Sequence, residues 1–240
     1  MEQVWTKPAY RAWLKHLKEL SDISYCQFSK RIIQTKYQIL GVRTPALNQL
    51  VNQIKKTDIA SFLKQVGHTY YEEVLIEGMV IASLKDPNEQ VTYLQKYILK
   101  IDNWALCDMT INRMKLVKKH LSFYLTFIED CLKEKAEFIK RFGFVLLLNY
   151  YMEESYLPLI FNWCDRYQAN DYYVEMAIAW LLSYCYLINK DQTVAYLKDG
   201  NLTSSICKKS IQKICESRRV SSAEKQDLKS MFIKKDGEIV

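Results

Sequence analysis

The chain has 240 residues and a formal net charge of +7, with 49% hydrophobic and 25% charged residues. This balance is that of a folded protein and excludes an intrinsically disordered chain. The six glycines and four prolines are too few for the turns of an all-β sandwich or barrel, so a mostly helical fold is expected.

The sequence lacks the signals for membrane insertion and for secretion. No run approaches the roughly 18 apolar residues that a membrane helix needs, and the most apolar stretch, residues 142–151, fits a buried helix. No basic start followed by an apolar block marks a secretory signal. The seven cysteines are scattered and odd in number, which is typical of buried thiols in a reducing compartment. We therefore expect a cytoplasmic protein of the bacterial intracellular type, with no membrane contact.

Apolar residues at helical spacing predict short helices from the N-terminus onward. Pro8 stands in the first turn of one such helix. The apolar face of the helix that follows carries Tyr25, Phe28, Ile32 and Ile33. Gly41 is expected to break the chain after it. Thr44 is expected to cap the next helix, which Pro45 opens.

Four segments of similar sequence predict a repeating architecture. Each carries a small residue at the matching position, and these residues are Gly78, Gly143, Ala177 and Ser210. Their separations are 65, 34 and 33 residues. A period in the thirties is typical of stacked helix pairs, in which small residues let neighbouring helices approach closely. The alternative is a non-repeating helical bundle. We expect one domain over residues 1–240, with a frayed tail at residues 232–240.

Several common catalytic sites have no signature in this sequence. A phosphate-binding Gly-rich loop and a Gly-x-Ser-x-Gly elbow are both missing. His16, His68 and His120 have no partner at metal-ligand spacing, so neither a metal ion nor a cofactor is expected. Cys107 adjoins Asp108 without a histidine nearby in sequence, which favours a buried thiol over a nucleophile.

Trp104 and Asp108 are four residues apart, so they share one face of a helix. An aromatic ring beside a carboxylate can pack against a flat, electron-poor group and stabilise positive charge. Each residue alone has a plainer interpretation, with Trp104 as a packing residue and Asp108 as a cap or an ion-pair partner. Trp180 lies in an apolar run and, taken alone, is also more typical of a core.

Basic residues follow this turn and recur toward the C-terminus. In successive helical repeats, residues at matching positions line one surface, and a basic surface can follow a phosphate backbone. The alternative is a solvated face, because Glu134, Glu137, Glu216 and Glu224 lie nearby in sequence. The basic residues concerned are Arg43, Lys115, Lys118, Lys119, Lys140, Arg141, Lys208, Lys209, Lys213, Arg218 and Arg219.

The order and spacing of these residues resemble the AlkD-like DNA alkylation repair family. The match runs through most of the chain, with landmarks at residues 40–45, 102–108, 141, 177–180 and 213–221. The resemblance implies an all-α fold of HEAT-like repeats stacked into a curved α-solenoid. It also implies that the basic residues bind DNA.

Family members of known activity are monofunctional DNA glycosylases that excise positively charged N3- or N7-alkylated purines from duplex DNA. Trp104 and Trp180 match the aromatic residues that contact the lesion-bearing DNA in the family. Asp108 matches the carboxylate near the scissile bond, and these three residues form the expected catalytic set. Arg141 matches a residue that engages the DNA backbone. Asn103 stands where well-studied active members carry a second Trp.

Two other functions remain open. The chain can be a non-catalytic HEAT-like repeat protein that binds branched or distorted DNA without excising bases. It can also be a helical scaffold for protein partners. The expected partner in the leading interpretation is duplex DNA that contains alkylated bases, bound by a monomer.

Overall fold

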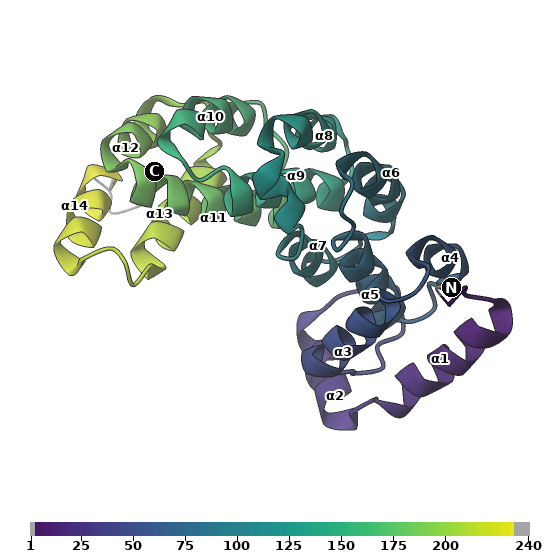
Figure 1. The fold of residues 1–240 in the computed structure, drawn as a ribbon. Coiled ribbons are helices and arrows are strands. Elements are labelled where there is room, and N and C mark those ends of the chain that lie inside the picture. The colour runs from purple at the N-terminus through teal and green to yellow at the C-terminus, as the bar shows by residue number, and fades with distance from the viewer. Residues whose placement is uncertain (1–2, 233–240) are drawn as a thin grey trace. The chain divides into compact units, whose positions relative to one another are not determined.

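The computed structural model describes residues 3–232, and these residues fold into helices throughout (Figure 1). The strand-like pairing among them is an isolated bridge between Gln38 and Tyr70. The predicted all-α class is therefore confirmed. None of the described helices is long and apolar enough to cross a membrane. The chain divides into two compact units, Met1–His120 and Leu121–Val240, which are described in turn. The prediction of one domain over residues 1–240 stays a prediction.

Unit 1 is built around a central helix that is buried along its whole length. Its described α-helices are α1 (Lys7–Glu19), α2 (Ile23–Ile32), α3 (Thr44–Ile54), α4 (Ile59–Gln65), α5 (Tyr71–Ile81), α6 (Pro87–Tyr97) and α7 (Trp104–Ile111). Two 3-10 helices, η1 (Ile98–Lys100) and η2 (Lys115–Lys119), flank α7. All residues of α5 are buried, and α3, α6 and α7 pack against it.

The chemistry of helix ends explains the boundaries in unit 1. Pro8 lies in the first turn of α1, as the sequence predicts, and the structure adds Thr6 as the cap of this helix. Gly41 breaks the chain with a φ of 84°, a left-handed conformation that favours glycine. The prediction that Thr44 caps α3 is wrong by one residue. Arg43 occupies the cap position, and Thr44 is the first residue inside the helix.

The apolar face predicted for α2 is only partly buried. Ser29 is the buried residue of this helix, whereas Phe28 and Ile32 are 46% and 44% exposed. Ile33, just beyond the helix, is buried. Helical spacing predicts the helix correctly, but neighbouring helices leave Phe28 and Ile32 of the predicted face exposed.

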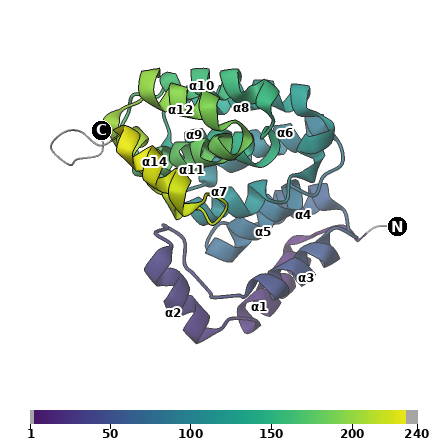
Figure 2. The same ribbon diagram turned by 90° about the vertical axis from the view of Figure 1, so that its left-hand side faces the viewer.

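Unit 2 consists of two layers of helices. Its described helices are α8 (Leu121–Lys133), α9 (Glu137–Tyr150), η3 (Glu154–Tyr156), α10 (Leu157–Asp165), α11 (Tyr172–Ile188), α12 (Lys190–Asp199), α13 (Ser204–Glu216) and α14 (Ser222–Phe232). One layer holds α9, α11 and α13, which pack side by side. The outer layer holds α8, α10 and α12, and the views in Figures 1 and 2 agree on this arrangement. Consecutive helices thus alternate between the layers.

Two sequence predictions fall on the ends of unit 2. Within the apolar stretch 142–151, residues 142–148 of α9 are all buried and Tyr151 is the buried C-cap residue, so the predicted buried helix is confirmed. Phe232, placed in the frayed tail by the sequence, is instead the last residue of α14 and is buried because its ring is apolar. The remainder of that tail, residues 233–240, lies outside the described residues.

The small residues of the four similar segments lie on α5, α9, α11 and α13. Gly78 on α5 faces Tyr97 of α6 and Thr110 of α7, and a Cβ at Gly78 would lie 2.3 Å from their hydroxyl oxygens. Gly143 on α9 faces Leu132 of α8, where a Cβ would lie 2.8 Å from Cδ2. Close approach of α6 and α7 to α5 therefore requires glycine at position 78, whereas at position 143 it depends on whether the Leu132 side chain can move.

The two glycines should respond differently to replacement by alanine. Gly78→Ala is expected to lower the free energy of unfolding by about 2 kcal/mol, because buried Tyr97 and Thr110 hydrogen-bond to each other and cannot yield freely. Gly143→Ala should cost less than about 1 kcal/mol, because the flexible Leu132 side chain can turn away and alanine favours the helix. Urea unfolding followed by helical circular dichroism measures both. Equal losses in the two variants would contradict this account.

Candidate nucleic-acid interface

Trp104 and Asp108 lie one turn apart on α7, and both are half-buried. The residues between them, Ala105, Leu106 and Cys107, are buried and fix the helix against the core of unit 1. The indole N–H of Trp104 donates to the backbone carbonyl of Ile32 at 3.1 Å. The predicted pairing of an aromatic ring and a carboxylate at one surface is therefore present.

A small cavity lies behind the Trp104 ring. Its volume is about 90 Å³, and its lining includes Tyr25, Tyr71, Glu72, Trp104 and Met109. Glu72 is 1% exposed, and its carboxylate accepts backbone N–H groups from Leu40, Gly41 and Val42 at 2.7–3.1 Å. Burial raises the pKa of Glu72, while these three donors act in the opposite direction. Glu72 therefore fixes the chain that leads into Arg43.

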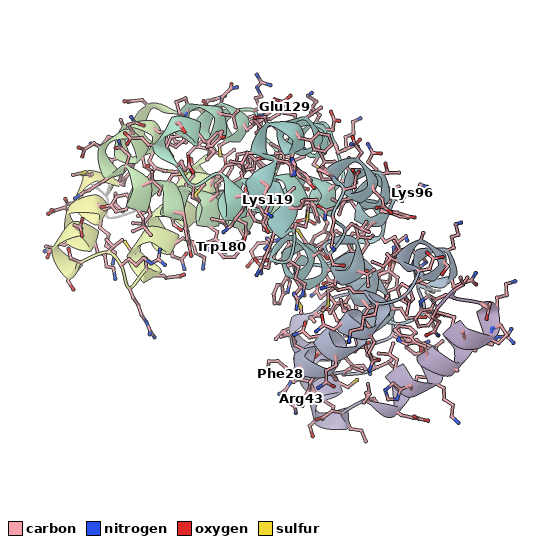
Figure 3. All side chains as sticks on the ribbon, in the orientation of Figure 1. Phe28, Arg43, Lys96, Lys119, Glu129 and Trp180 are labelled. Carbon is pink, nitrogen blue, oxygen red and sulfur yellow. The ribbon has the colours of Figure 1, made fainter. Side chains whose placement is uncertain are left out.

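Arg43 is exposed, but its charge already has a partner. Its Nε donates to Oδ2 of Asp22 at 2.9 Å, and its guanidinium lies over the Tyr25 ring, 5.0 Å from the centroid. The N–H of Tyr25, followed by Arg43, lowers the pKa of Asp22. Arg43 is labelled in Figure 3. A phosphate at Arg43 would compete with Asp22.

The positive charge of the lysines in η2 is compensated less than the charge of Arg43. Lys115, Lys118 and Lys119 are all exposed, and none of them forms an ion pair with a residue that the structure describes. Lys119 is labelled in Figure 3. These three lysines are the strongest positive feature that the sequence analysis identified in unit 1.

Arg141 in unit 2 is buried, with 6% of its surface exposed. Its Nη1 donates to the carbonyl of Tyr173 at 2.8 Å, and the N–H of Tyr173 donates to Glu137 at 2.8 Å. Arg141 thus links α9 to the first turn of α11. Its neighbour Lys140 is half-buried, and its ammonium lies 5.4 Å from the ring centroid of Tyr167. The predicted contact of both residues with DNA stays a prediction.

Trp180 borders a pocket of about 210 Å³ that is formed entirely within unit 2. The lining residues are Trp180, Ser183, Tyr184, Leu187, Lys213, Glu216, Ser217 and Arg219. The rings of Trp180 and Tyr184 meet edge to face, with 6.5 Å between centroids, and the guanidinium of Arg219 lies 5.7 Å from the Tyr184 centroid. In Figure 3, Trp180 lies on the side of unit 2 opposite Glu129 of the outer layer. Aromatic rings and cations therefore line the same pocket.

The basic residues of α13 and the turn after it are not equivalent. Lys209 donates to the buried carboxylate of Glu175 at 2.5 Å and to Ser205 at 2.6 Å. Lys213 pairs with Glu216 at 2.7 Å, and this hydrogen bond lowers the pKa of the Glu216 carboxyl. Three exposed residues make no ion pair within residues 3–232, and they are Lys208, Arg218 and Arg219. The positive charge available to an anion is therefore smaller than the sequence count.

The structure groups the predicted residues by unit. Unit 1 brings together Trp104 and Asp108, and unit 2 brings together Trp180, Lys213 and Arg219. Sequence reasoning missed Tyr184, although its spacing of four residues from Trp180 places both on one helix face. It also missed Glu72, whose backbone partners 30–32 residues away leave no signal in the local pattern. No group of metal-binding side chains occurs within residues 3–232.

Comparison with models of protein families identifies the family of this chain. A search of the curated proteins finds no match. A protein-family model described as DNA alkylation repair enzyme matches residues 13–214. This range includes Trp104, Asp108, Arg141 and Trp180. This match covers most of the chain and indicates a role in alkylation repair, with DNA as the substrate. The chain belongs to the DNA alkylation repair enzyme family.

Proposed function

We propose that this protein is a monofunctional DNA glycosylase that excises positively charged N3- or N7-alkylated purines from duplex DNA. The observation that carries the proposal is the pair on α7, where an indole ring and a carboxylate reach the surface one turn apart. The family membership supplies DNA as the substrate. We expect the protein to act inside the cell as a monomer.

The chemistry follows from the charge of the lesion. An alkylated purine is already cationic, so the bond between C1′ and the base nitrogen breaks with its electron pair moving to the base. The sugar gains oxocarbenium character, which the carboxylate of Asp108 stabilises. Water then adds to C1′, and Asp108 accepts its proton. A tryptophan face attracts a cationic base by about 0.5–2 kcal/mol.

The alternation of layers in unit 2 supports a HEAT-like arrangement of helix pairs. In such an arrangement, the inner helices α9, α11 and α13 present one continuous face. The pocket beside Trp180 opens on this layer and carries Arg219. We assign this face to the DNA backbone, because exposed cations next to aromatic rings suit a polyanion with flat bases.

One observation favours the second candidate function, DNA binding without base excision. Asn103 is 1% exposed and caps α7 through the N–H groups of Ala105 and Leu106. It takes the place of the second Trp of well-studied active members, so this turn presents a single indole. Less aromatic surface would weaken the hold on a cationic base.

Replacement of the Asp108 carboxylate distinguishes base excision from DNA binding without excision. Asp108→Asn should lower the rate of base release from methylated duplex DNA by at least about 100-fold, because the neutral amide does not stabilise the sugar cation. Trp180→Ala should lower it by about tenfold through loss of its aromatic face. Release is measured by chromatography of free bases after incubation with excess enzyme.

Asp86→Asn is the matched control for Asp108→Asn. Asp86 is exposed and caps α6, a position that asparagine fills equally well, so release should not change. Full activity of Asp108→Asn would refute the assigned role. A native protein that releases no base but binds DNA with a steep salt dependence would establish the second function in its place.

Arg219 should contribute to DNA binding through its charge. Arg219→Ala is expected to weaken binding of duplex DNA and to reduce the slope of log affinity against log salt by about 1. Arg166→Ala is a matched control, since this exposed arginine also lies over an aromatic ring, Trp163 at 4.7 Å, but at the end of outer-layer helix α10. Equal effects of the two variants, measured by fluorescence anisotropy, would contradict the assignment of the inner face.

A further inference from the structure

The start of α7 is joined to the segment after α2 by the carboxylate of Asp102. Both of its oxygens accept from the hydroxyl of Thr35 at 2.9 Å, and Oδ2 also accepts the backbone N–H of Lys36 at 2.7 Å. These partners are 66–67 residues away in the sequence. A charged acceptor forms stronger hydrogen bonds than a neutral one, so this tertiary contact is well suited to fix the segment.

Asn103 orients the Asp102 carboxylate. Its side-chain nitrogen donates to Oδ1 of Asp102 at 2.7 Å, while its side-chain oxygen accepts the N–H groups of Ala105 and Leu106 at 3.0 and 3.1 Å. The amide is buried, so each of these groups needs its partner inside the protein. Asn103 therefore connects the cap of α7 to Asp102.

Two further hydrogen bonds connect the same two elements. The hydroxyl of Tyr37 donates to the carbonyl of Lys100 at 2.8 Å, and the indole of Trp104 donates to the carbonyl of Ile32 at 3.1 Å. Burial, together with the charges of Asp102 and Glu77, raises the pKa of Tyr37 to about 12. Tyr37 therefore keeps its proton and remains a donor at neutral pH.

Apolar packing holds α2 itself only weakly, although Ile33 just beyond the helix is buried. Ser29 is the buried residue of α2, and the last turn of the helix leaves Phe28 and Ile32 exposed. Burial of apolar surface is ordinarily the main stabilising term for a helix in a protein. Where that burial is small, the polar contacts at the end of the helix decide its position.

We infer that Asp102 is a positioning residue for Trp104. Its carboxylate holds residues 33–37 against the start of α7 and so keeps the Ile32 carbonyl within hydrogen-bond distance of the Trp104 indole. The ring is thereby fixed in one orientation at the surface that also carries Asp108. The consequence for base excision rests on the proposed function, whereas the positioning itself does not.

Hydrogen exchange of the Trp104 indole N–H tests the inference without DNA. The signal is identified in the full-length, ¹⁵N-labelled protein by its loss in Trp104→Phe. Asp102→Asn should speed exchange by about tenfold or more, because the hydrogen bonds from Thr35, Lys36 and Asn103 lose the carboxylate charge and the new NH2 group faces one of these donors. Thr35→Val, a milder change, should act in the same direction by a smaller factor.

A double variant that swaps the residues at positions 102 and 103 distinguishes a positioning role of Asp102 from a general effect on stability. In Asp102→Asn combined with Asn103→Asp, the new amide at 102 donates to the new carboxylate at 103, which still caps α7. Exchange should slow back toward the native rate. Asp58→Asn is the control, because Asp58 caps α4 in the same unit and asparagine caps equally well. This control should leave the Trp104 signal unchanged.

The inference is overturned if Asp102→Asn and Thr35→Val both leave the exchange rate of the indole unchanged. It is also overturned if the indole N–H of the double variant exchanges as fast as that of Asp102→Asn alone. Where the native protein releases bases, Asp102→Asn should lower the single-turnover rate about tenfold and change the Kd for DNA less than about threefold. A native protein without base release would remove the proposed function and leave the exchange result standing.

Discussion

A carboxylate withdrawn from water needs hydrogen-bond donors inside the protein, and α5 carries three that are at most 5% exposed. The carboxylate of Glu72 accepts hydrogen bonds from the backbone N–H groups of residues 40–42. The carboxylate of Glu73 accepts hydrogen bonds from the Tyr10 hydroxyl and from the N–H groups of Thr69 and Tyr70. The carboxylate of Glu77 forms hydrogen bonds with the side chains of His68 and Lys100. Each carboxylate thus recruits a different part of unit 1, and the fold of this unit depends on satisfying all three.

This constraint reaches the candidate site through Lys100. The Lys100 side chain binds Glu77 on α5, while its backbone carbonyl accepts the hydroxyl of Tyr37. Two residues later, Asp102 binds Thr35 and Lys36. The turn that presents Trp104 is therefore held from the core on one side and from the segment after α2 on the other. Under the proposed function Trp104 contacts the lesion, and support on both sides suits a side chain with that role.

Unit 2 applies the same principle with fewer groups. Glu175 on α11 is 4% exposed and holds Lys209 and Ser205 of α13, and Arg141 on α9 holds the carbonyl of Tyr173 on α11. These contacts join consecutive inner helices through buried charge. They also explain why a count of lysines and arginines overstates the charge available to DNA. Lys209, for example, is basic in the sequence, but in the fold its charge is paired with Glu175.

Local patterns in the sequence predicted what depends on neighbours along the chain. Pro8 and the apolar run of α9 were recognised because capping and helical spacing are properties of a few consecutive residues. The exposure of Phe28 could not be predicted, because it depends on whether another helix covers α2. Asp102 and Glu72 were missed as supporting residues for a related reason. Their partners lie 30–67 residues away, and acids at those positions look like any solvated charge.

Position 103 connects the support of the site to its chemistry. An aromatic residue there would enlarge the surface that attracts a cationic base, but it could neither cap α7 nor donate to Asp102. Loss of the cap alone typically costs about 1 kcal/mol, and Asp102 would also lose one of its donors. Asn103 thus belongs to the hydrogen-bonded frame that holds the start of α7 and Trp104. Under the proposed function, the site would rely on this one indole for contact with the base and on the carboxylate of Asp108, one turn away, for the chemistry.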